Sequence, residues 1–186
     1  DGTGEVLLGL LCLAFALPLA QQIETFIGNH PGCKFIAYFQ AHTNTLAPVR
    51  RLRKEYEIIF GFKDIVGLFI GTRPDAIADD VYPLLEELNQ KTYLTVELGL
   101  QSSHDRSLEF LQRHHTYRQF LDTFEKLKKR NIDVVVHLIV GIPGESREDM
   151  LHTVKTMSRL KPAGVKFHLM HVLKNTPLFD LFQKEP

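Results

Sequence analysis

Five short apolar runs of the sequence each end in residue types that can bind a small polar molecule. Gln40 and Thr43 follow the first run, Glu97 lies within the third, and Gln101 comes directly after it. The other runs lead into GTRPD at 71–75, GIPGE at 141–145 and KNTP at 174–177. Amides, hydroxyls, carboxylates and guanidinium groups make the hydrogen bonds that orient ligands. The pattern predicts a small-molecule site, although Gly, Pro, Asn and Thr are also common in ordinary turns.

Glu97 is the most unusual of these residues because it stands inside the apolar segment LTVELGL. An unpaired carboxylate in such a place is costly. A ligand contact or a buried ion pair would account for it, and we favour the ligand. His168 and His171 fall on opposite faces of one predicted strand, which argues against joint binding of a metal ion. We interpret His114 and His115 as a helix-end pair rather than as a metal site.

The order of apolar and amphipathic segments predicts an α/β fold. Strands are expected at residues 34–40, 66–71, 94–100, 134–140 and 165–171, with one more within 6–15. Helices are expected at residues 21–27, 49–60, 77–88, 107–111, 117–130, 147–160 and 177–182. About six strand–helix units predict a partial (βα)6 TIM-like barrel with a parallel sheet, in a single domain spanning 1–186. Near-continuous apolar strands indicate a sheet that is buried on both faces.

The composition limits the possible partners. The 22 basic residues balance 22 acidic ones, so the chain has no overall attraction to nucleic acid or to an anionic membrane. We interpret the basic clusters at 50–54 and 126–130 as solvated helix faces. Two cysteines are too few for a disulfide scaffold and favour a reducing, cytoplasmic setting.

The two ends of the chain suggest a fragment. The chain begins with Asp and ends directly after an amphipathic run, so we expect the domain to be truncated at both ends. The apolar stretch at 6–20 is short for a bilayer span and has no basic residue before it. A buried strand or helix is therefore favoured over a signal peptide, and no membrane partner is expected.

Four segments occur in a fixed order: KFIAYFQAHTNTLAPV at 34–49, IGTRPD at 70–75, VELGLQSSHDRSLEFLQRHHTY at 96–117 and GIPGESREDM at 141–150. Together they resemble the radical S-adenosylmethionine (radical SAM) proteins related to the elongator catalytic subunit and to coproporphyrinogen dehydrogenase. The resemblance implies a 4Fe-4S cluster held by three cysteines, with S-adenosylmethionine on its open iron. One electron then cleaves S-adenosylmethionine to a 5′-deoxyadenosyl radical. It also implies an electron donor protein and, by analogy, a substrate such as tRNA.

The resemblance assigns cofactor contacts to residues of this chain. Gln40 and Thr43 would lie at the end of the strand that faces the methionine amino group of S-adenosylmethionine. Glu97 and Gln101 would border its ribose and methionine portions.

Three further residues complete this predicted cofactor site. Arg113 would pair with the methionine carboxylate, for which a guanidinium fork is well suited. Gly141 and Pro143 would let the backbone approach the adenine. The family usually has glycine after the arginine, whereas this chain has His114.

The cysteines depart from the family pattern. The family has a cysteine before Asp-Gly-Thr and a C-x-x-C shortly afterwards, whereas this chain begins at Asp-Gly-Thr and carries Cys12-Leu13-Ala14-Phe15 in the second place. Phe15 cannot ligate iron. Cys12 is therefore a doubtful metal ligand, and we interpret Cys33 as structural. The sequence predicts a chain that does not assemble a stable cluster.

Three interpretations follow. The chain is a truncated or altered form of a radical SAM enzyme, or it is a degenerate barrel that binds S-adenosylmethionine or a partner without redox chemistry. The third is a TIM-like barrel enzyme that acts on small metabolites without radicals, and the four motifs weigh against it. The iron and sulfide content of the purified protein separates the first two.

Overall fold

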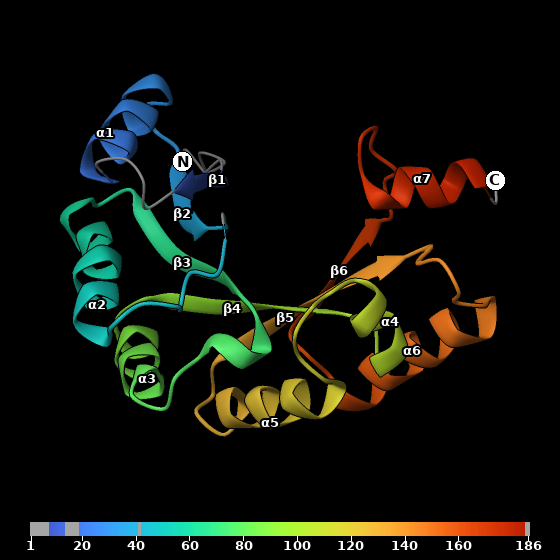
Figure 1. The fold of residues 1–186 in the computed structure, drawn as a ribbon. Helices are drawn as coiled ribbons and strands as arrows, with labels where there is room; N and C mark the ends of the chain where they lie inside the picture. Colours follow the sequence, from blue (N-terminus) through green and yellow to red (C-terminus); the bar gives the residue numbers. More distant parts are fainter. Residues whose placement is uncertain (1–7, 14–18, 41, 185–186) are drawn as a thin grey trace, which may run out of the picture.

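The computed structural model describes residues 8–13, 19–40 and 42–184, and its centre is a six-stranded sheet. The strands follow the chain order from one edge to the other: β1 (Leu8–Leu13), β2 (Lys34–Phe39), β3 (Ile65–Thr72), β4 (Tyr93–Gln101), β5 (Asp133–Val140) and β6 (Gly164–Leu169). Every neighbouring pair is parallel. The sheet curves into about half of a barrel (Figure 1). The predicted α/β partial barrel with a parallel sheet is therefore confirmed.

Helices lie along the outer, convex side of the curved sheet (Figure 1). They are α1 (Leu19–Asn29), α2 (Val49–Glu57), α3 (Val81–Lys91), α4 (Asp105–Phe110), α5 (Tyr117–Lys128) and α6 (Arg147–Leu160). Two of them begin with capping boxes, formed by Thr116 with Gln119 at α5 and by Ser146 with Asp149 at α6. Each box binds backbone N–H groups that the first helical turn leaves without partners, which fixes where the helix starts.

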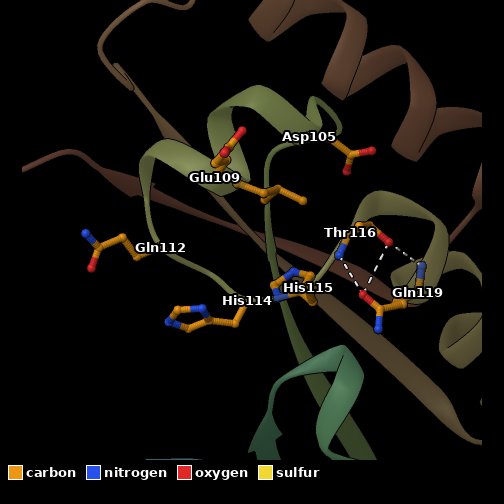
Figure 2. Close-up of a pocket in the computed structure, with 8 residues that line it drawn as sticks. Asp105, Glu109, Gln112, His114, His115, Thr116 and Gln119 are labelled. Carbon is orange, nitrogen blue, oxygen red and sulfur yellow. Dashed lines mark hydrogen bonds between the residues drawn. The ribbon is translucent and has the colours of Figure 1, made fainter.

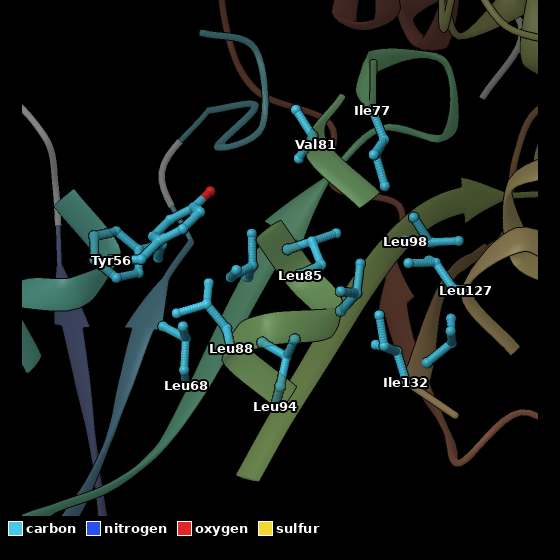
Figure 3. Close-up of a cluster of buried hydrophobic side chains, with 14 of the residues drawn as sticks. Tyr56, Leu68, Ile77, Val81, Leu85, Leu88, Leu94, Leu98, Leu127 and Ile132 are labelled. Atoms are coloured by element: carbon cyan, nitrogen blue, oxygen red, sulfur yellow. The ribbon is translucent and has the colours of Figure 1, made fainter. Parts of the chain in front are cut away.

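The hydrophobic core lies between the convex face of the sheet and these helices. Along β4, Leu94, Val96, Leu98 and Leu100 point into this layer and are at most 1% exposed. They meet α3 side chains such as Leu85 and Leu88 (Figure 3). Because side chains alternate along a strand, the residues between these leucines and valines face the concave side. One strand therefore builds the core with one face and offers Glu97 on the other.

The prediction of a sheet buried on both faces is wrong at β6. On its outer face Val165 is 36%, Phe167 54% and Leu169 68% exposed. The helix that follows, α7 (Pro177–Lys184), contributes no buried residue within the described chain. It lies beyond the end of β6 instead of returning over the sheet (Figure 1). The apolar pattern therefore predicted the strand β6 correctly, but it did not predict that no helix packs against the outer face of this strand.

Element boundaries differ from the predictions by three residues or more at two helices, and by one or two residues at several others. The helix predicted at 49–60 ends at Glu57 and continues as a 3-10 turn, Ile58–Gly61. The helix predicted at 77–88 begins only at Val81. The strand predicted within 6–15 is β1, and residues 6, 7, 14 and 15 lie outside the described residues. Among the described helices, none is long and apolar enough to cross a membrane.

Candidate functional site

The carboxyl ends of the central strands surround a pocket of about 300 Å³. Its lining residues come from β2, β3, β4 and β5 and from the loops that follow three of these strands: Tyr38, Gln40, His42, Thr43, Gly71, Thr72, Arg73, Glu97, Gly99, Arg113 and His137. The structure thus brings together four of the predicted site residues, namely Gln40, Thr43, Glu97 and Arg113. This end of a parallel sheet is where ligands bind in such folds.

The loop after β2 is fixed by two buried polar residues. Asn44 Nδ2 donates to the carbonyl oxygens of Phe39, at 2.8 Å, and of Gly71, at 2.9 Å. Thr45 Oγ1 donates to the Ala76 carbonyl at 2.7 Å. These bonds tie the loop that carries Thr43 to the end of β3. The sequence analysis missed both anchors, because Asn and Thr are common in loops and give no separate signal.

Gln101 and Arg113 meet over Gly99. A Cβ atom at Gly99 would lie 2.9 Å from Gln101 Nε2 and 3.0 Å from Arg113 Nη2, so a side chain at this position would displace both groups. Arg113 Nη2 donates to the Gly99 carbonyl at 3.3 Å. Gln101 has a φ of 77° at the point where the register between β4 and β5 shifts. Its Oε1 is buried and has no hydrogen-bond partner among the described residues.

Arg113 carries a positive charge that is not directly paired with a carboxylate of the described residues. Its Nε is buried without a hydrogen-bond partner, and no ion pair with a described carboxylate is present. Burial lowers the pKa of Arg113 and the charge of Arg73 lowers it further, while the charge of Asp75 acts in the opposite direction. Arg73 itself is paired with Asp75, whose Oδ1 accepts from Arg73 Nε at 3.0 Å. An anion bound beside Arg113 would therefore be stabilised by both charge and unused hydrogen-bond donors.

Glu97 is 5% exposed and is the centre of a polar network on the concave face. Its Oε2 accepts hydrogen bonds from Tyr38 OH and from His137 Nε2, the latter at 2.5 Å, and lies 3.6 Å from Lys166 Nζ. Burial alone would raise the pKa of Glu97, but the hydrogen bonds from His137 and Tyr38 and the charge of Lys166 hold it below its ordinary value. The buried ion pair offered as one explanation for this carboxylate is present, and Glu97 also lines the pocket, where a ligand contact stays a prediction.

The remaining predicted residues lie at the same end of the sheet but outside the pocket lining. Gly141 directly follows β5 and has a φ of 81°, a conformation that favours glycine. Pro143 is half-buried two residues further on. Tyr38, His137 and Lys166 were missed by the sequence analysis. A signal existed for His137, since it interrupts the apolar run VVVHLIV much as Glu97 interrupts its own.

A second pocket, of about 450 Å³, lies beside α4 and the start of α5 (Figure 2). His114 is exposed there, whereas His115 is 5% exposed and its Nδ1 lies 3.2 Å from the Arg113 carbonyl oxygen. The described residues contain no group of three His, Cys, Asp or Glu side chains that could hold a metal ion. Both histidines lie in the loop between α4 and α5 and not at a helix end. The contact of His115 with the backbone of Arg113 fits a structural role for His115.

The two cysteines lie at opposite ends of the sheet. Cys12 is exposed on β1, and its Sγ lies 3.7 Å from Gln40 Oε1, at the same rim as the pocket. Cys33 precedes β2, at the amino end of the strands. A 4Fe-4S cluster of the family type needs three thiolates together. The residues of this chain do not fit that requirement, since only one cysteine stands at the rim.

Comparison with known proteins identifies the family. Residues 19–157 match the radical SAM superfamily. The chain belongs to this superfamily. It is 46% identical over 151 residues to the uncharacterized protein YtqA of Bacillus subtilis (strain 168). The aligned region covers 81% of the chain and 47% of YtqA. It is 31% identical over 125 residues to the tRNA uridine(34) acetyltransferase of Methanocaldococcus jannaschii, covering 64% of the chain and 22% of that protein.

The radical SAM fold is also seen in a solved structure. Elp3 of Methanocaldococcus infernus with an N-terminal deletion matches with a TM-score of 0.74 at 22% identity, over 96% of the chain and 49% of that protein. Radical SAM enzymes use S-adenosylmethionine and a 4Fe-4S cluster, so the chain is an enzyme core by family membership. It spans about half the length of YtqA. Because the chain belongs to the radical SAM superfamily, the interpretation as a barrel enzyme outside this superfamily is wrong.

Proposed function

We propose that the pocket at the carboxyl ends of β2 to β4 binds S-adenosylmethionine, and that the chain is the cofactor-binding core of a radical SAM enzyme. The observation that carries this proposal is the guanidinium of Arg113, which makes no direct ion pair with a described carboxylate, in a pocket that also contains Gln40, Thr43 and Glu97. This combination suits a molecule that carries an amino group and a carboxylate on one carbon atom.

The methionine end of S-adenosylmethionine fits these donors and acceptors. Its carboxylate would accept from Arg113, as the family resemblance implies. Its ammonium group needs acceptors, and Glu97 Oε1 makes no hydrogen bond to a described residue because the network uses Oε2. Gln40 Oε1 and Thr43 Oγ1 are further acceptors at the same rim. In this proposal Gln101 borders the ribose, and Gly141 and Pro143 border the adenine.

The cluster is a separate matter. A bound 4Fe-4S cluster would supply the electron that cleaves S-adenosylmethionine, but one cysteine at the rim does not fit its three-thiolate requirement. The proposal for this chain therefore concerns cofactor binding, and its failure to assemble a cluster stays a prediction. The electron donor protein and the cytoplasmic location stay predictions.

For the whole enzyme we propose a tRNA substrate. The support is the relative whose name is tRNA uridine(34) acetyltransferase, which shares 31% identity with the chain. The balanced charge of the chain offers no general attraction to RNA, so binding would depend on local contacts. The degenerate barrel without redox chemistry is not favoured by these relatives.

Calorimetric titration of the chain with S-adenosylmethionine tests the pocket. Arg113→Gln should weaken binding roughly 10- to 100-fold, because a hydrogen bond to a charged group contributes about 1.5–3 kcal/mol. Arg118→Gln is the matched control, since Arg118 is an exposed arginine of α5 that pairs only with Asp122 among the described residues. Equal binding by both variants, or no binding by the unaltered chain, would overturn the proposal.

A further inference from the structure

Three side chains from neighbouring strands form a continuous line on the concave face. Glu97 Oε2 on β4 lies 2.5 Å from His137 Nε2 on β5. His137 Nδ1 lies 3.2 Å from His168 Nε2 on β6, and the two imidazole rings are 5.0 Å apart. The line climbs towards the carboxyl ends of the strands, because Glu97 is paired with Val135, two residues before His137, and His137 with Lys166, two residues before His168. It therefore leads from the floor of the cofactor pocket towards the open mouth of the half-barrel.

The hydrogen-bond chemistry fixes where the protons lie. An ionised carboxylate only accepts, so the proton between Glu97 and His137 belongs to His137 Nε2. In a neutral imidazole the other nitrogen, Nδ1, is then an acceptor, and His168 Nε2 must donate to it. This assignment leaves the lone pair of His168 Nδ1 free, and no described residue makes a hydrogen bond to that atom.

The surroundings keep His168 in its neutral form. Burial lowers the pKa of His168, protonation of His137 and the charge of Lys166 lower it further, and the charge of Glu97 acts in the opposite direction. Glu97, His137 and Lys166 are the titratable groups that face His168 from β4, β5 and β6. Tyr38 of β2 lies next to them, with its OH 3.3 Å from Lys166 Nζ. A neutral imidazole with a free lone pair on a half-buried surface is a base.

We propose that Glu97, His137 and His168 form a proton relay that serves a substrate bound against β6. The ligand is a molecule that presents a weakly acidic N–H or O–H group to His168 Nδ1. That proton passes to Nδ1, and the electron pair of the broken bond stays on the substrate. The Nε2 proton of His168 moves to His137 Nδ1, and the imidazolium of His137 is then paired with Glu97. The ammonium of Lys166 lies on the same face of β6 and stabilises the substrate anion.

The linear order of the three residues separates a relay from a metal site. Metal ligands converge on one point, whereas His137 stands between Glu97 and His168 and uses both ring nitrogens for them. The relay also extends beyond the cofactor pocket. Glu97 and His137 line the pocket, whereas His168 and Lys166 do not, so the end of the relay that meets the substrate lies outside the cofactor pocket.

Nitrogen-15 NMR of the histidine side chains in the full 186-residue chain tests the relay without any cofactor. Two-bond proton–nitrogen spectra of the unaltered chain should show His168 protonated on Nε2 and unprotonated on Nδ1, with His137 protonated on Nε2. Glu97→Gln should lower the pKa of His168 by roughly one unit, because an opposite charge that stabilises the protonated relay is removed. When His137→Phe is already present, Glu97→Gln should lower the pKa of His168 by less than about a third of that amount.

The double comparison separates a relay from simple packing. A substitution that only loosens the sheet would move other histidines too, so His30 in α1, whose Nδ1 lies 2.9 Å from the Phe26 carbonyl oxygen, is the internal reference. Equal effects of Glu97→Gln with and without His137 would overturn the relay. So would a His168 protonated on Nδ1 in the unaltered chain, a result that needs no variant to fold. Both readouts differ from the titration with S-adenosylmethionine, so failure of the relay and failure of the cofactor site are distinguishable.

Discussion

A methyl group added at Gly99 would perturb the pocket without removing any polar group from it. An ideal Cβ at this position lies 2.9 Å from Gln101 Nε2 and 3.0 Å from Arg113 Nη2, whereas ordinary contacts begin at 3.4 Å. Both atoms are the far ends of flexible side chains, so they can move by about half an ångström while the backbone stays in place. We therefore expect Gly99→Ala to displace the amide and the guanidinium and to leave the fold intact.

The expected loss of affinity follows from these distances. The hydrogen bond from Arg113 Nη2 to the Gly99 carbonyl is already 3.3 Å long, so a further shift takes it beyond useful geometry and turns the guanidinium away from the ligand. Loss of one charged hydrogen bond, about 1.5–3 kcal/mol, corresponds to roughly 10- to 100-fold weaker binding of S-adenosylmethionine. The free energy of unfolding should change by less than about 1 kcal/mol. Replacing glycine reduces the conformational entropy of the unfolded chain, and this stabilisation offsets the cost of crowding in the folded state.

The assay is calorimetric titration with S-adenosylmethionine beside urea unfolding followed by circular dichroism. Gly61→Ala is the control, because no described atom lies within 4 Å of the Cβ that it would add. Unchanged affinity in Gly99→Ala would show that Arg113 and Gln101 do not contact the ligand. A loss of affinity accompanied by an equal loss of stability would show that the substitution disturbs the fold and not the pocket.

Three further predictions concern stability and the cluster. Glu97→Gln should lower the free energy of unfolding by about 1–3 kcal/mol at pH 7, because the donors of Tyr38 and His137 lose a charged acceptor. The pKa of Glu97 is depressed by folding, so this difference should be complete above the ordinary glutamate pKa and should be lost as the pH falls through the lower pKa of the folded state, which urea titrations at several pH values will measure. Asn44→Ala should cost about 2–4 kcal/mol in urea unfolding, because two carbonyl oxygens lose their donor and the Asn44 side chain is 2% exposed; a loss under about 0.5 kcal/mol would contradict the role of Asn44 as an anchor. Anaerobic reconstitution with iron and sulfide should give no near-stoichiometric cluster and no 5′-deoxyadenosine under reductant, and a brown protein that forms 5′-deoxyadenosine would contradict the count of cysteines at the rim.

The strands and helices that build the hydrophobic core were predictable from local sequence patterns. The segment LTVELGL gave β4 because its apolar residues suit a pleated, buried surface, and the amphipathic pattern around Phe120 and Phe124 gave α5. The boundaries were less predictable where local hydrogen bonding competes with the helix. At Ile58–Gly61 and Pro74–Ala76 the chain forms 3-10 turns inside or beside predicted helices. The exposure of Phe167 and Leu169 was missed because strand pattern does not reveal which helix returns over the strand.

The sequence by itself determined the order of strands and helices, the polar residues at the carboxyl ends of the strands and the shortage of cysteines. Each of these depends on residue type and short spacing alone. Only the tertiary structure decided that Glu97 meets His137, 40 positions later, and that Arg113 closes over Gly99. The register of parallel strands and the bulge between Gly99 and Gln101 control those meetings. Register is set by the packing of the whole curved sheet, so no local pattern in the chain specifies which polar side chains become neighbours.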